Sequence, residues 1–315
     1  MRTIFISSLC FLTSSLLAQS PVRITTERES GGVLVLYAEN NTCVPHTVQI
    51  VFSELENMQA PVSINDPHET VVFRGRQQLL RLRPEGGAPR YRFSSLSFRG
   101  NLKEKADTNY VYLLPAAPDK GIRPGKLVRM EKFLGKQSSG KSTGISVPMT
   151  EGDTVFACRG GIVSEMKEGY ESEEKDQKKG DGRVFSTGEN FVEIYHKDGS
   201  FMRYTIFEKD RIFVEPGDRV YPGQPLGIVG GKEYRSGPHV RLSTYFLKRV
   251  PREDSSFSSS RAHSFLPVFY LGENKQEKLI FNEEYTVPSP PVAFITSEMS
   301  KSERKKYLKA QKKNK

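Results

Sequence analysis

The stretch "NFVEIYHKDGSFMRYTIF" (residues 190–207) contains two segments in which apolar and polar residues alternate, joined by Lys197-Asp198-Gly199. Such alternation is typical of strands with one buried face, and an Asp-Gly pair suits the tight turn of a hairpin. Downstream, "EPGDRVYPGQPLGIVGG" (residues 215–231) carries more short strand segments between Pro-Gly and Gly-Gly pairs. Glycine adopts a positive φ at little cost, so these pairs let the backbone reverse. This part of the chain therefore predicts an antiparallel sheet domain.

Six short segments occur in a fixed order across about a hundred residues of this region. They are "GDTVFA" (152–157), "GIV" (161–163), "NFVEIYHKDG" (190–199), "YTIF" (204–207), "GDRVYPGQPLG" (217–227) and "GPHVR" (237–241). In this order and spacing the chain resembles the lysostaphin-type (LytM-like) zinc peptidases that cut peptidoglycan. The resemblance implies a β-sheet core domain with barrel-sandwich hybrid geometry over residues 144–288.

The resemblance also implies where a zinc ion would bind. In that family a His and an Asp of the first segment and the second His of the last segment hold the metal. Here these positions are Ser142, Ser146 and Arg241. A catalytic zinc needs three ligands such as imidazole or carboxylate, whereas a guanidinium is a fixed cation without an acceptor atom. We therefore expect no zinc and no other cofactor, and we interpret the domain as a degenerate member.

The acid–base groups implied by the resemblance are also incomplete. Ile206 stands where the family has a His after its tyrosine, and His239 is the one catalytic position that keeps its histidine. A single histidine without metal or partner does not activate water, so we expect no catalytic residue and a hydrogen-bonding role for His239. The remaining groove is expected to be formed by Ser142, Ser146, Tyr204, His239 and Arg241.

The N-terminal half predicts a second all-β domain. Residues 21–118 contain short segments rich in Val, Leu, Phe and Tyr, separated by turn residues such as Asn65-Asp66-Pro67 and Gly86-Gly87. This spacing favours an antiparallel, immunoglobulin-like β-sandwich. Residues 119–143, which are basic and contain Gly and Pro, are predicted to be a linker.

The first 18 residues have the composition of a secretory signal peptide. Arg2 precedes an apolar run over residues 4–17, and Ala18 is a suitable last residue before cleavage. The run is short for a membrane span, although an uncleaved anchor is the alternative. We therefore predict export to the periplasm or cell envelope and no transmembrane segment after cleavage. The two remaining cysteines, Cys43 and Cys158, either pair or stay as separate thiols.

Most of the formal charge of +10 lies near the C-terminus. From Lys301 to Lys315 the chain carries eight Lys or Arg and one acidic residue. Such blocks are commonly solvated, disordered arms that bind polyanions, so residues 289–315 are predicted to be a disordered tail that contacts an anionic surface. The alternative is a helical tail with a solvated face and no partner. Because an exported protein rarely meets nucleic acid, we do not expect nucleic acid as the partner.

Three functions fit these observations. The first is a catalytically inactive protein of the cell envelope, a pseudoenzyme whose groove binds cell-wall peptide or glycan, or a partner protein such as a wall hydrolase. The second is an active zinc endopeptidase with non-standard ligands that cleaves peptidoglycan cross-links. The third is a biotinyl- or lipoyl-like carrier module, which has a similar sheet, with Lys232 or the Met166-Lys167 pair as the attachment site.

Overall fold

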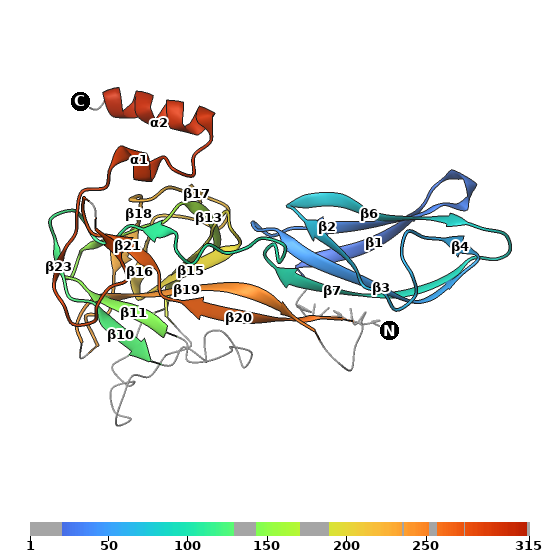
Figure 1. Ribbon diagram of the computed structural model, residues 1–315, viewed down its shortest axis with the longest axis horizontal. Helices are drawn as coiled ribbons and strands as arrows, with labels where there is room; N and C mark the ends of the chain where they lie inside the picture. The colour runs from blue at the N-terminus through green and yellow to red at the C-terminus, as the bar shows by residue number, and fades with distance from the viewer. Residues whose placement is uncertain are drawn as a thin grey trace, which may run out of the picture.

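The computed structural model describes residues 21–128, 143–170, 189–234, 236–251, 257–273 and 275–313. These residues form two β-rich bodies that lie end to end along the long axis of the molecule, followed by a short helical segment (Figure 1). The prediction of an all-β fold is confirmed, because β-strands make up nearly all of the regular structure in both bodies.

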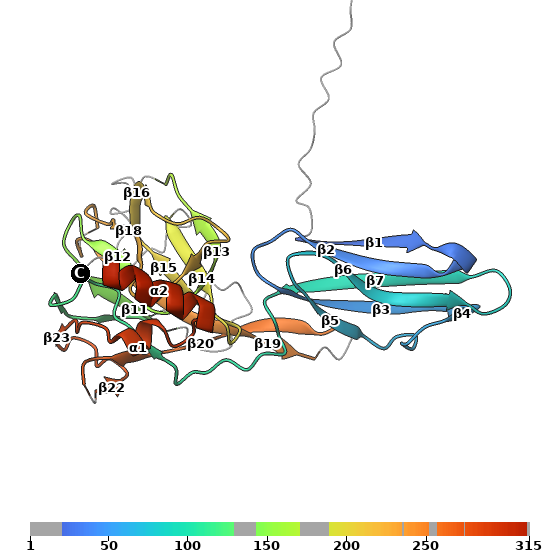
Figure 2. The same ribbon diagram turned by 90° about the horizontal axis from the view of Figure 1, so that it is seen from above.

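The N-terminal body is a sandwich of two antiparallel sheets that pack on one core (Figure 2). The strand order is β1-β2-β6-β4 in one sheet and β5-β3-β7 in the other. Leu36, Phe52 and Leu82 are fully buried between the sheets. The elements are β1 (Val22–Arg28), η1 (Ser30–Gly32), β2 (Leu34–Asn40), β3 (His46–Glu56), β4 (Met58–Gln59), β5 (His68–Val72), β6 (Gly75–Pro84) and β7 (Arg90–Arg99).

The C-terminal body is built on an eight-stranded sheet of order β10-β11-β19-β15-β14-β13-β17, with β20 paired to β19. A three-stranded sheet, β12-β18-β16, packs on the same core. The hairpin predicted at Lys197-Asp198-Gly199 is present as β14 and β15. The strands from β11 onward are β11 (Thr143–Pro148), β12 (Thr154–Phe156), β13 (Gly161–Lys167), β14 (Phe191–Tyr195), β15 (Ser200–Thr205), β16 (Phe207–Ile212), β17 (Arg219–Val220), β18 (Pro225–Val229), β19 (His239–Val250), β20 (Ser259–Phe265), β21 (Val268–Tyr270), β22 (Gln276–Glu277) and β23 (Tyr285–Thr286).

Residues 109–128 belong to the C-terminal body, which corrects the expected domain limits. β8 (Val111–Tyr112) pairs in parallel with β21, and Tyr112 is fully buried in the second core. β9 (Gly121–Ile122) pairs with β23, and β10 (Gly125–Val128) pairs with β11. The apolar pattern identified the strand near residue 111 but not its partner, which lies more than 150 residues along the chain. The rest of the expected linker, residues 129–142, lies outside the described residues.

A buried carboxylate ties the two bodies together. Glu193 on β14 is fully buried and accepts from Arg203 Nε at 2.8 Å and from Tyr245 Oη at 2.8 Å. Arg99, at the end of β7 in the sandwich, places its Nη2 2.6 Å from Glu193 Oε1. Burial alone would raise the pKa of Glu193, but Arg203 and Arg99 hold it below its ordinary value. The carboxylate therefore stays ionised and links the sandwich to the main sheet.

The C-terminal segment is ordered, so the prediction of a disordered tail over residues 289–315 is wrong for its described part. It contains α1 (Val292–Ile295) and α2 (Lys301–Lys313). Between them, Glu298 accepts two hydrogen bonds from Arg159, at 2.7 and 3.0 Å. Arg159 is 2% exposed, also pairs with Asp198 at 3.0 Å, and stacks on the ring of Tyr110. A buried guanidinium thus holds the segment against the domain.

Cys43 and Cys158 are both free thiols, and burial raises the pKa of Cys158 to about 12. Within the described ranges, no helix is long and apolar enough to span a membrane. The predicted signal peptide, residues 1–18, lies outside them.

Replacing Glu298 with alanine tests the role of the Arg159 contact. The substitution leaves a buried guanidinium with Asp198 as its remaining carboxylate partner, and breaking a buried pair in this way costs about 3 kcal/mol of unfolding free energy. Urea denaturation measures the change. Glu283→Ala, at an exposed position near β23, is the matched control and should change stability by less than about 0.5 kcal/mol. Equal stability of the two variants would show that the Arg159–Glu298 contact does not hold the C-terminal segment on the domain.

Candidate functional site

Two of the three positions expected to hold zinc lie directly opposite each other in the main sheet. Ser146 on β11 is paired with Arg241 on β19, and Arg241 is paired on its other side with Thr205 on β15. Directly opposed residues of adjacent strands share one face of a sheet, and residues two apart on a strand do so as well. His239, two residues before Arg241, therefore lies on this face too. Ser142 lies outside the described residues.

Tyr204 does not belong to this face, which corrects the expected groove. It is paired with Leu242, and Leu242 is paired with Ile145, so the row points into the hydrophobic core. Tyr204 is 0% exposed, and its hydroxyl oxygen accepts from the backbone N–H of Cys158 at 2.8 Å. Because a strand alternates faces, the neighbour Thr205 takes the groove position instead.

A hydrogen-bonded network occupies the centre of the face. Arg241 Nη1 donates to Glu189 Oε1 at 2.6 Å, and Arg241 Nε donates to His239 Nε2 at 3.2 Å. The guanidinium also lies over the ring of Tyr234, 5.3 Å from its centroid. Arg241 and Glu189 are both buried. The guanidinium thus stands between a carboxylate and an imidazole, the kinds of group that would otherwise bind a metal cation.

Sequence reasoning missed Glu189. This residue lies two positions before β14, near the end of a charged stretch that offered no pattern pointing to the groove. Its pKa is raised by burial, although Arg241 and a hydrogen bond from Thr205 oppose the shift. Its Oε1 is bound to Arg241, while Oε2 is buried and has no hydrogen-bond partner in the described part of the chain.

The contacts of His239 define its protonation state. Nε2 accepts from Arg241, so it carries no proton, and Nδ1 donates its proton to the carbonyl of Gly237 at 2.7 Å. The ring is therefore neutral. Burial lowers the pKa of His239, the hydrogen bond to Gly237 opposes this, and the charge of Arg241 lowers the pKa further. The lone pair that would accept a proton from water is already used.

Ile206 adopts a backbone conformation that is unusual for its type. Its φ is 76°, in the left-handed region, where a β-branched side chain is strained. Such outliers cost about 1–3 kcal/mol and cluster at functional sites. The side chain is buried and lies close to Gly231, where an added Cβ would meet Ile206 Cγ2 at 2.8 Å. At the position where the sequence resemblance implied a second catalytic histidine, this chain has a buried apolar side chain.

These residues do not fit a zinc ion. Ser146 offers a hydroxyl, Arg241 a permanent positive charge, and the lone pair of His239 is directed at that charge. Among the residues that the structure describes, no group of three or more His, Cys, Asp or Glu side chains is arranged to hold a metal. What the face offers is a pre-formed set of hydrogen-bonding groups.

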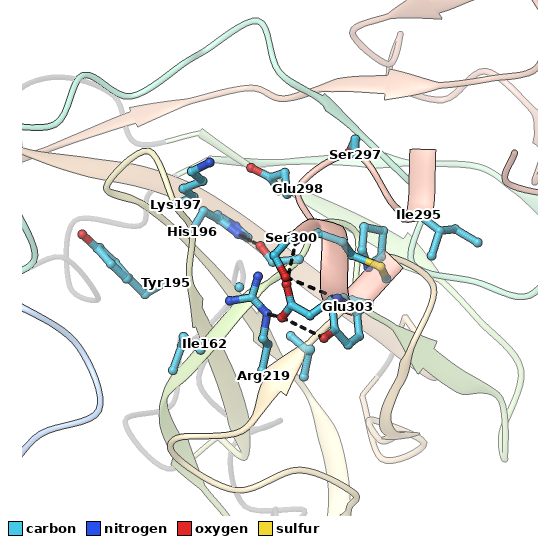
Figure 3. A pocket seen from close by; sticks show the side chains of 16 residues that line it. Ile162, Tyr195, His196, Lys197, Arg219, Ile295, Ser297, Glu298, Ser300 and Glu303 are labelled. Carbon is cyan, nitrogen blue, oxygen red and sulfur yellow. Dashed lines mark hydrogen bonds and ion pairs between the residues drawn. The ribbon is translucent and has the colours of Figure 1, made fainter. Parts of the chain in front are cut away.

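A cavity of about 420 Å³ adjoins this network. Phe207, Val229 and Pro238 form part of its lining, with Lys232 and Glu233 among the charged groups. Lys232 is largely exposed and forms an ion pair with Glu151 at 3.2 Å. A second cavity, about 480 Å³, lies elsewhere, between the β14–β15 hairpin and the C-terminal segment (Figure 3). The first cavity shares part of its lining, including Phe207 and Gly231, with a smaller hollow that Glu189 and Tyr234 line, so it lies beside the network.

Comparison with known proteins identifies this domain. Residues 140–251 match the model of peptidase family M23, so the chain contains an M23 (LytM-type) domain, as the six segments predicted. A search of curated proteins found no significant match.

Several solved structures are similar to this chain at low sequence identity. The M23 metalloprotease pseudoalterin, from the deep sea, is 16% identical, with 58% of this chain and 98% of that chain covered and a TM-score of 0.29. Csd3 of Helicobacter pylori is 12% identical, with 92% and 81% covered and a TM-score of 0.28. A zinc-containing peptidase of Vibrio cholerae is 12% identical, with 72% and 83% covered and a TM-score of 0.28.

The pKa of His239 reports whether the guanidinium of Arg241 lies beside it. Arg241→Met removes the nearby positive charge and leaves Glu189, so the pKa of His239 should rise from its lowered value. An NMR titration of the imidazole C–H resonances measures it. Lys232→Met, which removes a cation that does not contact His239, is the control and should leave the pKa unchanged. An unchanged pKa in Arg241→Met would show that the network is not formed in solution.

Proposed function

We propose that this protein is a catalytically inactive, M23-type protein of the cell envelope whose groove binds peptides of the cell wall. The M23 domain suggests a role related to peptidoglycan. The observation that supports binding without cleavage is the Arg241–Glu189–His239 network, in which Arg241 stands at one of the positions that the sequence resemblance assigns to a zinc ligand.

Hydrolysis of an amide by this type of site requires a water made nucleophilic by a metal or by a base. Arg241 opposes a metal because it places a fixed cation on the groove face. His239 does not act as a base because its free lone pair accepts from Arg241. Ile206 provides no proton-transfer group at all. The groove residues therefore supply recognition groups but no route to an activated water.

The groups that remain suit a peptide ligand. Glu189 Oε2, buried and without a partner among the described residues, accepts an N–H or ammonium donor. The adjoining cavity has apolar walls at Phe207 and Val229, and the exposed ammonium of Lys232 lies among its lining residues. Cell-wall peptides present amide N–H groups, amines and free carboxylates. A ligand that places a donor on Glu189 and a carboxylate near Lys232 would use all three features.

A zinc endopeptidase with non-standard ligands is the second candidate. Glu189 and His239 both direct ligand-type atoms at the same point, the guanidinium of Arg241. If Arg241 moved away, these atoms would be two of the three ligands that zinc requires. A carrier role for Lys232 is less well supported, because its ammonium is paired with Glu151, and intact mass without an adduct would exclude it.

Sedimentation with purified peptidoglycan, combined with chromatography of the supernatant, tests the proposal. We expect the protein to bind the polymer and to release no muropeptides. Lys232→Glu should weaken binding by about tenfold, since it replaces a charge-assisted contact with repulsion. Lys278→Glu, an exposed position outside the groove with the same charge change, should bind like the wild type. Released muropeptides, or equal binding by both variants, would count against the proposal.

A further inference from the structure

Within the described residues, the C-terminal helix α2 contacts the domain through the side that carries Glu303. Glu303 in its first turn reaches Arg219 Nε at 2.6 Å and accepts from the hydroxyl of Tyr221 at 3.1 Å; Figure 3 shows its side chain directed to Arg219. The start of the helix is fixed by a capping box, in which Ser300 N–H donates to Glu303 and Glu303 N–H donates to Ser300 Oγ. The rotation of the helix about its axis is therefore set by these contacts.

Four lysines of α2 lie on the opposite side. An α-helix advances about 100° per residue, which places these lysines within an arc of about 80° that is centred opposite Glu303 and Tyr307. Glu303 and Tyr307 are half-buried, whereas the lysines of this arc are exposed. We name this arc the lysine face; it consists of Lys301, Lys305, Lys309 and Lys312.

The lysine face is turned to solvent, so that a flat surface outside the molecule can contact it. In Figure 1, α2 stands outside the sheets of the C-terminal domain, at one edge of the molecule. The side that contacts Arg219 and Tyr221 is turned toward the domain, so the lysine face is turned outward. The helix is about 20 Å long, and a plane laid along it reaches the ammonium groups of all four lysines. No protein element described in the structure stands between that plane and the lysines.

We propose that the lysine face binds the surface of an anionic phospholipid bilayer. A bilayer is the planar polyanion that a straight, one-sided row of cations fits, and each lysine near such a surface strengthens binding by about fivefold. The helix has no broad apolar face, since Leu308 is its one exposed large aliphatic residue, so the attachment is electrostatic. It therefore weakens as salt rises. This surface is separate from the groove and does not depend on the groove's ligand.

Co-sedimentation of the full chain with vesicles tests this proposal. Vesicles of phosphatidylcholine with about a third phosphatidylglycerol should bind the protein, and pure phosphatidylcholine vesicles should not. Lys305→Gln, Lys309→Gln and Lys312→Gln, combined in one variant, should lower the partition coefficient by about a hundredfold. The matched control replaces Lys103, Lys105 and Lys278, which are exposed and outside the helix, with Gln, and should retain binding within a few-fold.

Two further measurements make every outcome informative. Circular dichroism melting confirms that both triple variants are folded, and peptidoglycan binding by the helix variant should match that of the wild type. Equal vesicle binding by the two triple variants would overturn the proposal, as would binding of phosphatidylcholine alone. The wild-type protein could also fail to bind anionic vesicles and yet bind soluble polyphosphate through the same lysines. This result would assign the lysine face to a polymer and would likewise overturn the proposal.

Discussion

The chemistry of the groove depends on one buried guanidinium, that of Arg241. Arginine keeps its charge in proteins, so burying it requires a counter-ion and aligned acceptors. Glu189 supplies the charge and His239 the second acceptor, which forces the imidazole to be neutral and uses its lone pair. The charge of Arg241 on β19 thereby helps to lower the pKa of His239 and opposes the rise that burial causes in the pKa of Glu189.

The need of a buried charge for a counter-ion recurs elsewhere in the C-terminal domain. Arg159 is buried between Asp198 and Glu298 and so fixes the C-terminal segment on the domain. Glu193 is buried between Arg203 and Arg99 and so fixes the sandwich on the main sheet. The Arg159–Glu298 and Arg99–Glu193 pairs join segments that are distant in sequence, and each buried charge loses its compensation if its partner is removed. Buried charges therefore hold the sandwich and the C-terminal segment on the domain that carries the groove.

The sequence predicted the features that depend on local pattern. Alternation and glycine turns gave the β14–β15 hairpin, and the motif order placed Ser146 and Arg241 in one site, where the structure pairs them. Features set by distant partners were not predictable in this way. Tyr204 was assigned to the wrong face, Glu189 was hidden in a charged stretch, and β8 pairs with a strand far along the chain. The Ser300-x-x-Glu303 capping box was a local signal for α2 that the charge of the tail obscured.

If Arg241 stands in place of a zinc ligand, the wild-type chain binds no zinc. The zinc content of the protein measures this directly. The wild-type chain and a variant with the related peptidases' ligands, Ser142→His, Ser146→Asp and Arg241→His, are incubated with zinc, dialysed and measured by plasma mass spectrometry. We predict almost no zinc on the wild type and a clear gain on the variant, which serves as the positive control. Stoichiometric zinc on the wild type, lost when His239 is replaced by alanine, would contradict the account.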